Sequence, residues 1–271
     1  MNKIFSTIKD LFPLLMLAIV LVLIFVPLPV MLIQILIILN LAFSLCLFAS
    51  KFFSKPAIVF HLPRLVQYFC LFTFALIIAT TRTFLAISSL EEQIPLILII
   101  GQWICRENCI CGIFTTLMLC ASLLLFCKKY LIRAQDAARI FFRLCLDTNT
   151  MNQKIFAIEQ QVAEKKITKE ESEILKEKVW LKANLYGSMD GAAKFLLGTM
   201  GVFSVLYIIA VIGGVAVGIL VRNMQWKDAL DEYVMLSSGY LVLFVVPLFL
   251  ASLGFRTGKP EQEDEETFMA R

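Results

Sequence analysis

Long apolar runs separated by short polar links dominate the chain. Six of these runs approach the length of about 20 residues that a helix needs to cross a bilayer core about 30 Å thick. They are residues 11–27, 29–50, 65–87, 110–127, 195–221 and 233–255. A further apolar run, 94–101, is too short to span, and we read it as re-entrant, interfacial or the start of a longer fourth helix. The pattern predicts an all-α polytopic integral membrane protein with about six transmembrane helices.

Basic residues in the polar links indicate the orientation of the chain. The link 51–64 carries two lysines and one arginine, and so does the stretch 128–133. By contrast, the link 88–93 carries two glutamates and no basic residue. Because Lys and Arg are enriched in cytoplasmic loops, both basic links are predicted to be cytoplasmic. With six crossings, the N- and C-termini are then cytoplasmic as well.

The same pattern divides the chain into four parts. They are an N-terminal membrane region with about four helices (1–127), a cytoplasmic helical loop (128–194), a C-terminal membrane helix pair (195–255) and a flexible charged tail (256–271). Within the loop, Thr168 is followed three residues later by Glu171. This spacing is typical of a capping box and predicts that a helix begins there.

Composition supports a membrane protein and argues against several other classes. The chain of 271 residues is 59% hydrophobic and only 17% charged, against about 25% charged in soluble domains. The net charge of +4 fits basic membrane loops better than a nucleic-acid surface. A single histidine and the C-x3-C-x-C spacing at 105–111 do not resemble a metal site. With no nucleophile elbow or phosphate loop either, we expect neither an enzyme nor a bound cofactor.

A few small or polar residues inside the apolar runs are candidates for helix packing. Asn40 is positioned to join two helices through a hydrogen bond. Gly213, Gly214 and Gly218 lie together in a later run, and the last two form a G-x-x-x-G pattern. Such patterns let helices approach closely, but they are common in membrane segments.

Three charged residues at the ends of apolar runs are candidates for function. Arg82 ends the third run, where its side chain either reaches the membrane surface or balances a buried acid. Asp190 and Lys194 are four residues apart, the spacing of a helical ion pair with the acid first. One interpretation is that Asp190 caps a membrane helix while Lys194 reaches the interface. The other is that Asp190 is a carboxylate at the entrance of a polar pathway, where it takes up and releases protons.

Several stretches resemble one family of membrane proteins. "LYGSMDGAAKF" (185–195) closely resembles the "FYGAMDGASKF" block of the FlhA/SctV family, the large export-gate component of flagellar and virulence type III secretion systems. "IATTR" (78–82) resembles its "VASTR", and "FRLCLD" (142–147) resembles its "RFTLD". "GQWICRENCICG" (101–112) keeps the Gly, Gln, Asn and Gly of "GQFVVGGNYVVG". The resemblance extends over nearly the whole chain.

The resemblance implies a function and a set of residues that serve it. Asp190 matches the family aspartate implicated in proton-driven export, and Lys194 matches its neighbouring lysine. Arg143 and Asp147 match a loop arginine and aspartate that affect export, and Arg82 matches the arginine of the "STR" motif. The implied protein lies in the bacterial inner membrane, surrounded by lipid, as a homo-oligomeric ring. It works with other export-gate membrane proteins, uses the proton motive force and meets secreted protein substrates indirectly.

The chain also departs from the family pattern. Gln34 and Tyr240 stand where the family has acids, Thr73 where it has a base and Ile77 where it has an asparagine. No Pro-Gly-Lys turn follows Asp147, and family members continue into further membrane helices and a cytoplasmic ring domain. We therefore keep a second reading, a non-conducting membrane scaffold or degenerate paralogue, and expect the chain to be a fragment, a truncated product or such a paralogue. A small-molecule transporter is a weaker reading, because no internal repeat is evident.

Overall fold

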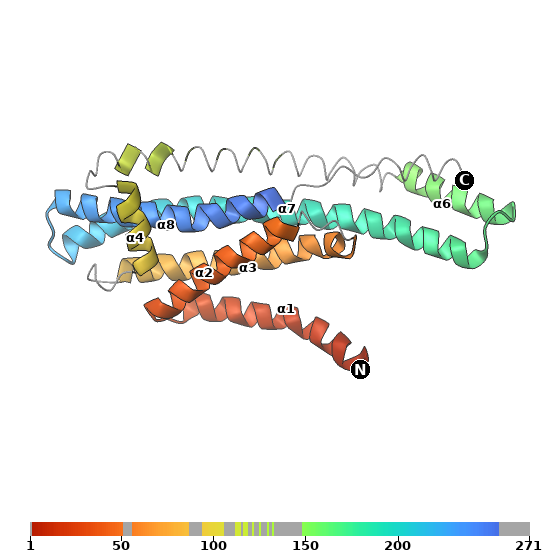
Figure 1. Ribbon diagram of the computed structural model, residues 1–271, viewed down its shortest axis with the longest axis horizontal. Coiled ribbons are helices and arrows are strands. Elements are labelled where there is room, and N and C mark those ends of the chain that lie inside the picture. The colour runs from red at the N-terminus through yellow and green to blue at the C-terminus, as the bar shows by residue number, and fades with distance from the viewer. Residues whose placement is uncertain are drawn as a thin grey trace.

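A computed structural model describes most of the chain as helices. The described residues are 2–50, 56–86, 94–105, 112–114, 116–118 and 148–254, with the single positions 121, 125, 129 and 132. The helices are α1 (Asn2–Phe25), α2 (Val30–Ser50), α3 (Pro56–Ala86), α4 (Pro95–Cys105), α6 (Thr148–Ala163), α7 (Lys169–Leu220) and α8 (Trp226–Gly254). Figure 1 shows most of them running along one long axis.

Four helices within the described residues are long and apolar enough to cross a membrane. They are Val30–Ser50, Leu62–Ala86, Gly187–Leu220 and Trp226–Gly254. These correspond to four of the six predicted spans, and they confirm an all-α polytopic membrane protein. The predicted span 11–27 falls in α1, whose apolar part, Pro13–Phe25, is shorter. The predicted span 110–127 lies mostly outside the described residues.

Helix α7 is the longest of the described elements, with 52 residues and hence a length of about 78 Å. It begins with the predicted capping box, which the structure confirms. The Thr168 hydroxyl accepts a hydrogen bond from the Glu171 amide at 3.2 Å, and the Glu171 carboxylate accepts one from the Thr168 amide at 2.8 Å. The helix continues without interruption through the predicted boundary between loop and membrane at residues 194 and 195.

The first third of α7 forms a helical hairpin with α6, which we call the α6–α7 hairpin (148–186). Lys165 turns the chain in a left-handed conformation, with a φ of 57°. Farther along, the Lys176 ammonium lies 2.7 Å from the Glu159 carboxylate and joins the two helices. Figure 1 shows this hairpin extending to one side of the remaining helices.

The remaining part of α7 packs with α2, α3 and α8 around one apolar core. Helix α3 lies along α7, and α8 contacts α2, α4 and α7. The short α4 crosses α8 at a steep angle in Figure 1. At this crossing the backbones nearly touch, because a Cβ built on Gly239 would lie 2.0 Å from the Ile97 carbonyl oxygen. The short run 94–101 therefore forms the crossing helix α4 rather than a span of its own.

Candidate functional site

Asp190 and Lys194 form an ion pair on α7, as their spacing predicts. The Lys194 Nζ lies 2.7 Å from the Asp190 Oδ2, and the Asp190 side chain is 15% exposed against 54% for Lys194. Because α7 begins at Lys169, Asp190 lies more than five turns inside the helix. The interpretation that Asp190 caps a membrane helix is therefore wrong. Gly187, Asp190 and Gly191 stand where the apolar run begins, which suggested that a helix starts there. The charged segment before them is part of the same helix, because α7 begins at Lys169.

The ion pair lies where α7 meets α3 at the beginning of its apolar span. On the α7 face beside Asp190, four side chains are buried, namely Met189, Ala192, Ala193 and Leu196. A Cβ built on Gly191 would lie 3.7 Å from the Gln67 side-chain nitrogen of α3. The carboxylate is thus largely shielded at one edge of the helix core, while the ammonium reaches outward.

Arg82 makes contacts that the sequence did not predict. Its guanidinium donates one hydrogen bond to the Ile24 carbonyl at 3.0 Å and another to the Val26 carbonyl. These carbonyls lie at the C-terminal end of α1, where no further helical turn can satisfy them. Arg82 therefore joins the ends of α1 and α3. Along α3 it is 15 residues from Gln67, so it lies about 22 Å from the level of Asp190.

The helix-packing candidates lie in close helix contacts. The Asn40 Oδ1 accepts a hydrogen bond of 2.8 Å from the Thr73 hydroxyl, which joins α2 to α3. Its Nδ2 has no partner among the residues that the structure describes. Gly214 and Gly218 both face the ring of Tyr233 on α8, where added Cβ atoms would lie 2.3 and 2.8 Å from ring carbons. At Gly213 a Cβ would lie 3.3 Å from a methyl of Leu85 on α3.

The centre of the bundle is neutral and hydrogen-bonded. Tyr240, which is fully buried, has its hydroxyl 2.8 Å from the Thr81 hydroxyl on α3. The Tyr240 ring stacks against Tyr207 at 6.4 Å between centroids and lies 5.7 Å from Phe203. Thr73, next to Asn40, is a second position where the family resemblance leads us to expect a charge. Both positions are occupied here by side chains whose hydroxyls are satisfied within the protein.

A comparison with protein families matches the FHIPEP family over residues 19–255. The chain belongs to the FHIPEP family. This match covers the Asp190–Lys194 pair, Arg82 and all four long apolar helices, and it confirms the family resemblance found in the sequence. It also agrees with the all-helical membrane architecture.

Curated FHIPEP-like relatives are similar over most of this chain. The flagellar biosynthesis protein FlhA of Bacillus subtilis (strain 168) is 27% identical over 217 residues, which are 80% of this chain and 31% of FlhA. The probable translocation protein y4yR of Sinorhizobium fredii (strain NBRC 101917 / NGR234) is 29% identical over 77% of this chain and 29% of y4yR. The hypersensitivity response secretion protein HrpI of Pseudomonas syringae pv. syringae is 28% identical over 73% of this chain and 28% of HrpI. The chain thus spans about a third of the length of these relatives. A comparison with solved structures found no match.

Two of the candidate residues that the FHIPEP resemblance suggested, Arg143 and Asp147, lie outside the described residues. Their roles stay predictions. Among the residues that are described, no three His, Cys, Asp or Glu side chains gather in a way that could hold a metal ion.

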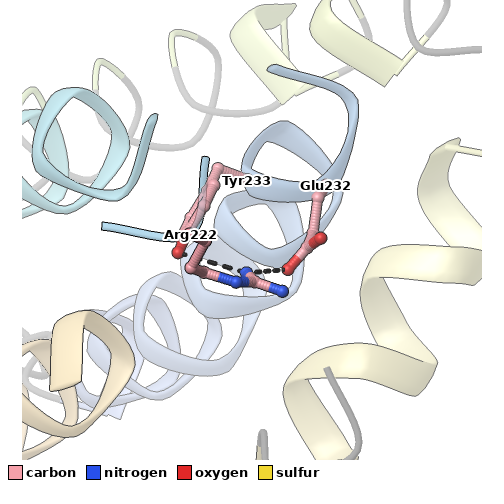
Figure 2. Close-up of polar contacts among 3 residues, drawn as sticks. All are labelled: Arg222, Glu232 and Tyr233. Carbon is pink, nitrogen blue, oxygen red and sulfur yellow. Dashed lines mark hydrogen bonds and ion pairs between the residues drawn. The ribbon is translucent and has the colours of Figure 1, made fainter. Parts of the chain in front are cut away.

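One polar cluster of this FHIPEP chain was not found from the sequence. Arg222, Glu232 and Tyr233 meet where α7 turns into α8, as Figure 2 shows. The predicted spans 195–221 and 233–255 leave the first two in the link between them, and the sequence patterns predicted no role for them. A signal was nevertheless present, since a base follows one apolar run directly and an acid precedes the next.

Proposed function

We propose that this protein is a membrane component of a type III protein export apparatus, flagellar or virulence, and that proton movement past Asp190 drives its contribution to export. The family supports the first part, because relatives named for flagellar biosynthesis and for hypersensitivity response secretion match most of this chain. The observation that carries the second part is the Asp190–Lys194 pair. It lies on the helix that runs without a break from the α6–α7 hairpin into the membrane.

The ion pair contributes little to stability, which favours a functional role. An exposed i,i+4 pair is worth about 0.3–0.5 kcal/mol, and Lys194 is more than half exposed. A partly shielded carboxylate at the start of an apolar span is costly, and such groups in membrane segments are often functional.

A long rigid helix offers a route from protonation to movement. When Asp190 takes up a proton, it loses its attraction for Lys194, and the charge at the contact of α7 with α3 changes. A small tilt of α7 at that point is carried along the helix to the α6–α7 hairpin, whose end lies about 32 Å away at Lys169. In this proposal, the hairpin lies in the cytoplasm and passes the movement to the export machinery.

The proposed setting is the bacterial inner membrane, with both termini in the cytoplasm. The membrane-spanning part of α7 exposes large apolar side chains that suit contact with lipid or with neighbouring subunits, among them Val205, Ile208 and Ile212. We propose that copies of the chain form a ring together with other export-gate membrane proteins, and that secreted substrates meet it indirectly. We propose no enzymatic activity and no cofactor.

The test replaces Asp190 in the native export system. Asp190→Asn keeps the size of the side chain and removes its titration, so secretion of export substrates should fall at least about tenfold. Asp190→Glu should restore part of the secretion. Lys194→Gln breaks the ion pair but keeps the titratable carboxylate, so it should reduce secretion less than Asp190→Asn does. Secretion by Asp190→Asn equal to that of the unaltered protein would refute the proton-coupled role.

A second candidate function is a non-conducting scaffold that places export partners in the membrane. The neutral centre favours it, because Tyr240 and Thr73 carry no charge and are satisfied by Thr81 and Asn40. A scaffold predicts that secretion is lost when the chain is deleted and is retained with Asp190→Asn. The proton-coupled function predicts that both changes impair secretion.

A further inference from the structure

A largely shielded ion pair joins the turn that follows α7 to helix α8. The Arg222 Nη1 lies 2.5 Å from the Glu232 Oε1, and the two side chains are only 15% and 8% exposed. The same nitrogen lies 3.4 Å from the Tyr233 hydroxyl. Figure 2 shows the guanidinium between the carboxylate and the phenol. The hydrogen bond to Glu232 raises the pKa of Arg222 further above its usual range, so the guanidinium stays charged.

The turn that builds this cluster is tight and specific. Helix α7 ends at Leu220, and α8 begins at Trp226. Between them, Asn223 adopts a left-handed conformation with a φ of 54°, which asparagine tolerates better than most residues. The Met224 amide then donates to the Gly218 carbonyl at 3.0 Å and draws the chain back over the end of α7. This geometry sets Arg222 opposite the second turn of α8.

Next to the ion pair, the Tyr233 ring packs directly against the backbone of α7 at two glycines, where any larger residue would collide with the ring. Added Cβ atoms at Gly214 and Gly218 would lie 2.3 and 2.8 Å from ring carbons, closer than real contacts allow. The ring also lies 5.8 Å from Phe84 on α3, which in turn lies 6.2 Å from Tyr240. The cluster is therefore connected to the centre of the bundle through packed aromatic rings.

The cluster and the Asp190–Lys194 pair lie near opposite ends of the same membrane-spanning helix. From Asp190 to the end of α7 at Leu220 there are 30 residues, or about 45 Å of helix, and Arg222 lies two residues beyond that end. Asp190 and Lys194 are both residues of α7, whereas Arg222 and Glu232 join the turn after α7 to α8. A displacement of α7 at the Asp190 end therefore reaches α8 only if the two helices are held together.

We propose that Arg222, Glu232 and Tyr233 form a clamp that locks α8 to α7 at the membrane face opposite the α6–α7 hairpin. In addition, and resting on the proposed function, the clamp carries movement of α7 to α8 and so to Tyr240. Removing one partner of a buried ion pair leaves an unpaired charge and is strongly destabilising, whereas exchanging both partners keeps the pairing. Loss of either charge should therefore loosen the helix pair, and a charge swap should tighten it again.

Distances between spin labels test the clamp in the full-length protein. Ile212 on α7 and Asp231 on α8 are both exposed, and each is replaced by a labelled cysteine in a background whose native cysteines are substituted. The unaltered clamp should give one narrow distance distribution. Glu232→Ala and Arg222→Ala should each widen it about twofold or more. The swap Arg222→Glu with Glu232→Arg should restore a narrow distribution.

The matched control is Asp228→Ala, which removes an exposed carboxylate from the first turn of the same helix. It should leave the distribution narrow. An equally narrow distribution in Glu232→Ala would overturn the clamp. Secretion is measured in parallel with Asp190 intact, and it should fall in Glu232→Ala and recover in the swap. A widened distribution with unchanged secretion would support the clamp and overturn its coupling to export. Normal secretion by Asp190→Asn would refute only the proton-coupled function and leave the clamp standing.

Discussion

At the residue scale, the structure turns isolated polar residues into specific pairs. The sequence identifies Asn40 as a residue that joins helices, but it cannot name Thr73 as the partner. That pairing depends on how α2 and α3 are shifted along each other, which packing alone decides. For the same reason, the sequence could not show that Arg82 binds carbonyls at the end of α1. Residue type indicates that a polar group needs a partner, and the fold selects which one.

The hydrogen bond between Thr73 and Asn40 gives a prediction at this scale. Thr73→Val removes the donor and leaves the buried Asn40 amide without its described protein partner, which should lower the free energy of unfolding by about 1 kcal/mol. Thermal unfolding in detergent measures it. Thr83→Val is the matched control on α3, because within the described part of the chain that hydroxyl bonds only to the Ala79 carbonyl of its own helix. Equal effects of the two changes would show that the contact to Asn40 is not stabilising.

At the element scale, the start of α7 was predictable and its length was not. The Thr168–Glu171 capping box depends on two side chains and neighbouring amides, so it can be read from the sequence. The continuity of α7 past Asp190 was missed, because a change from charged to apolar residues resembles a boundary. A helix tolerates such a change when its polar part packs on a partner, as α7 does on α6.

The capping box predicts an effect of pH on the α6–α7 hairpin. Hydrogen bonds from the Thr168 amide and then from its hydroxyl lower the pKa of Glu171 below its usual 4.5. Since the folded-state pKa is below the unfolded one, this stabilisation is complete above pH 4.5 and is lost as the pH falls through the lower folded value. The Glu171 amide proton shift, followed by NMR, should titrate with an apparent pKa below 4.5, and Glu171→Gln should abolish the titration. A transition at or above 4.5 would contradict the box.

At the scale of the whole molecule, close helix crossings decide how the helices predicted from the sequence are arranged in space. The six apolar runs are visible in the sequence, but the crossing of α4 over α8 is not. It depends on Gly101 and Gly239, which lie 138 residues apart in sequence and meet through their backbones. The Arg222–Glu232 pair was missed for a related reason, because burial of charges in a link depends on a tight turn that brings α8 back along α7.

The crossing predicts that a single methyl group disrupts the bundle. Gly239→Ala would place its Cβ 2.0 Å from the Ile97 carbonyl oxygen, so the backbones must separate. We expect the free energy of unfolding to fall by about 2 kcal/mol or more. Gly201→Ala is the control, because nothing lies within 4 Å of an added Cβ there, and it should be neutral or stabilise by up to about 1 kcal/mol. A tolerated Gly239→Ala would show that α4 and α8 do not cross this closely.

The central claim, that Asp190 passes protons in a protein of the export apparatus, is tested most directly by proton flux. The purified protein is reconstituted into vesicles with an imposed pH difference, and internal pH is followed with a trapped dye. The account predicts proton entry that Asp190→Asn reduces at least about tenfold and that the control Asp228→Ala leaves unchanged. Equal flux with and without the Asp190 carboxylate, or no flux above that of empty vesicles, would contradict it and leave the scaffold as the better account.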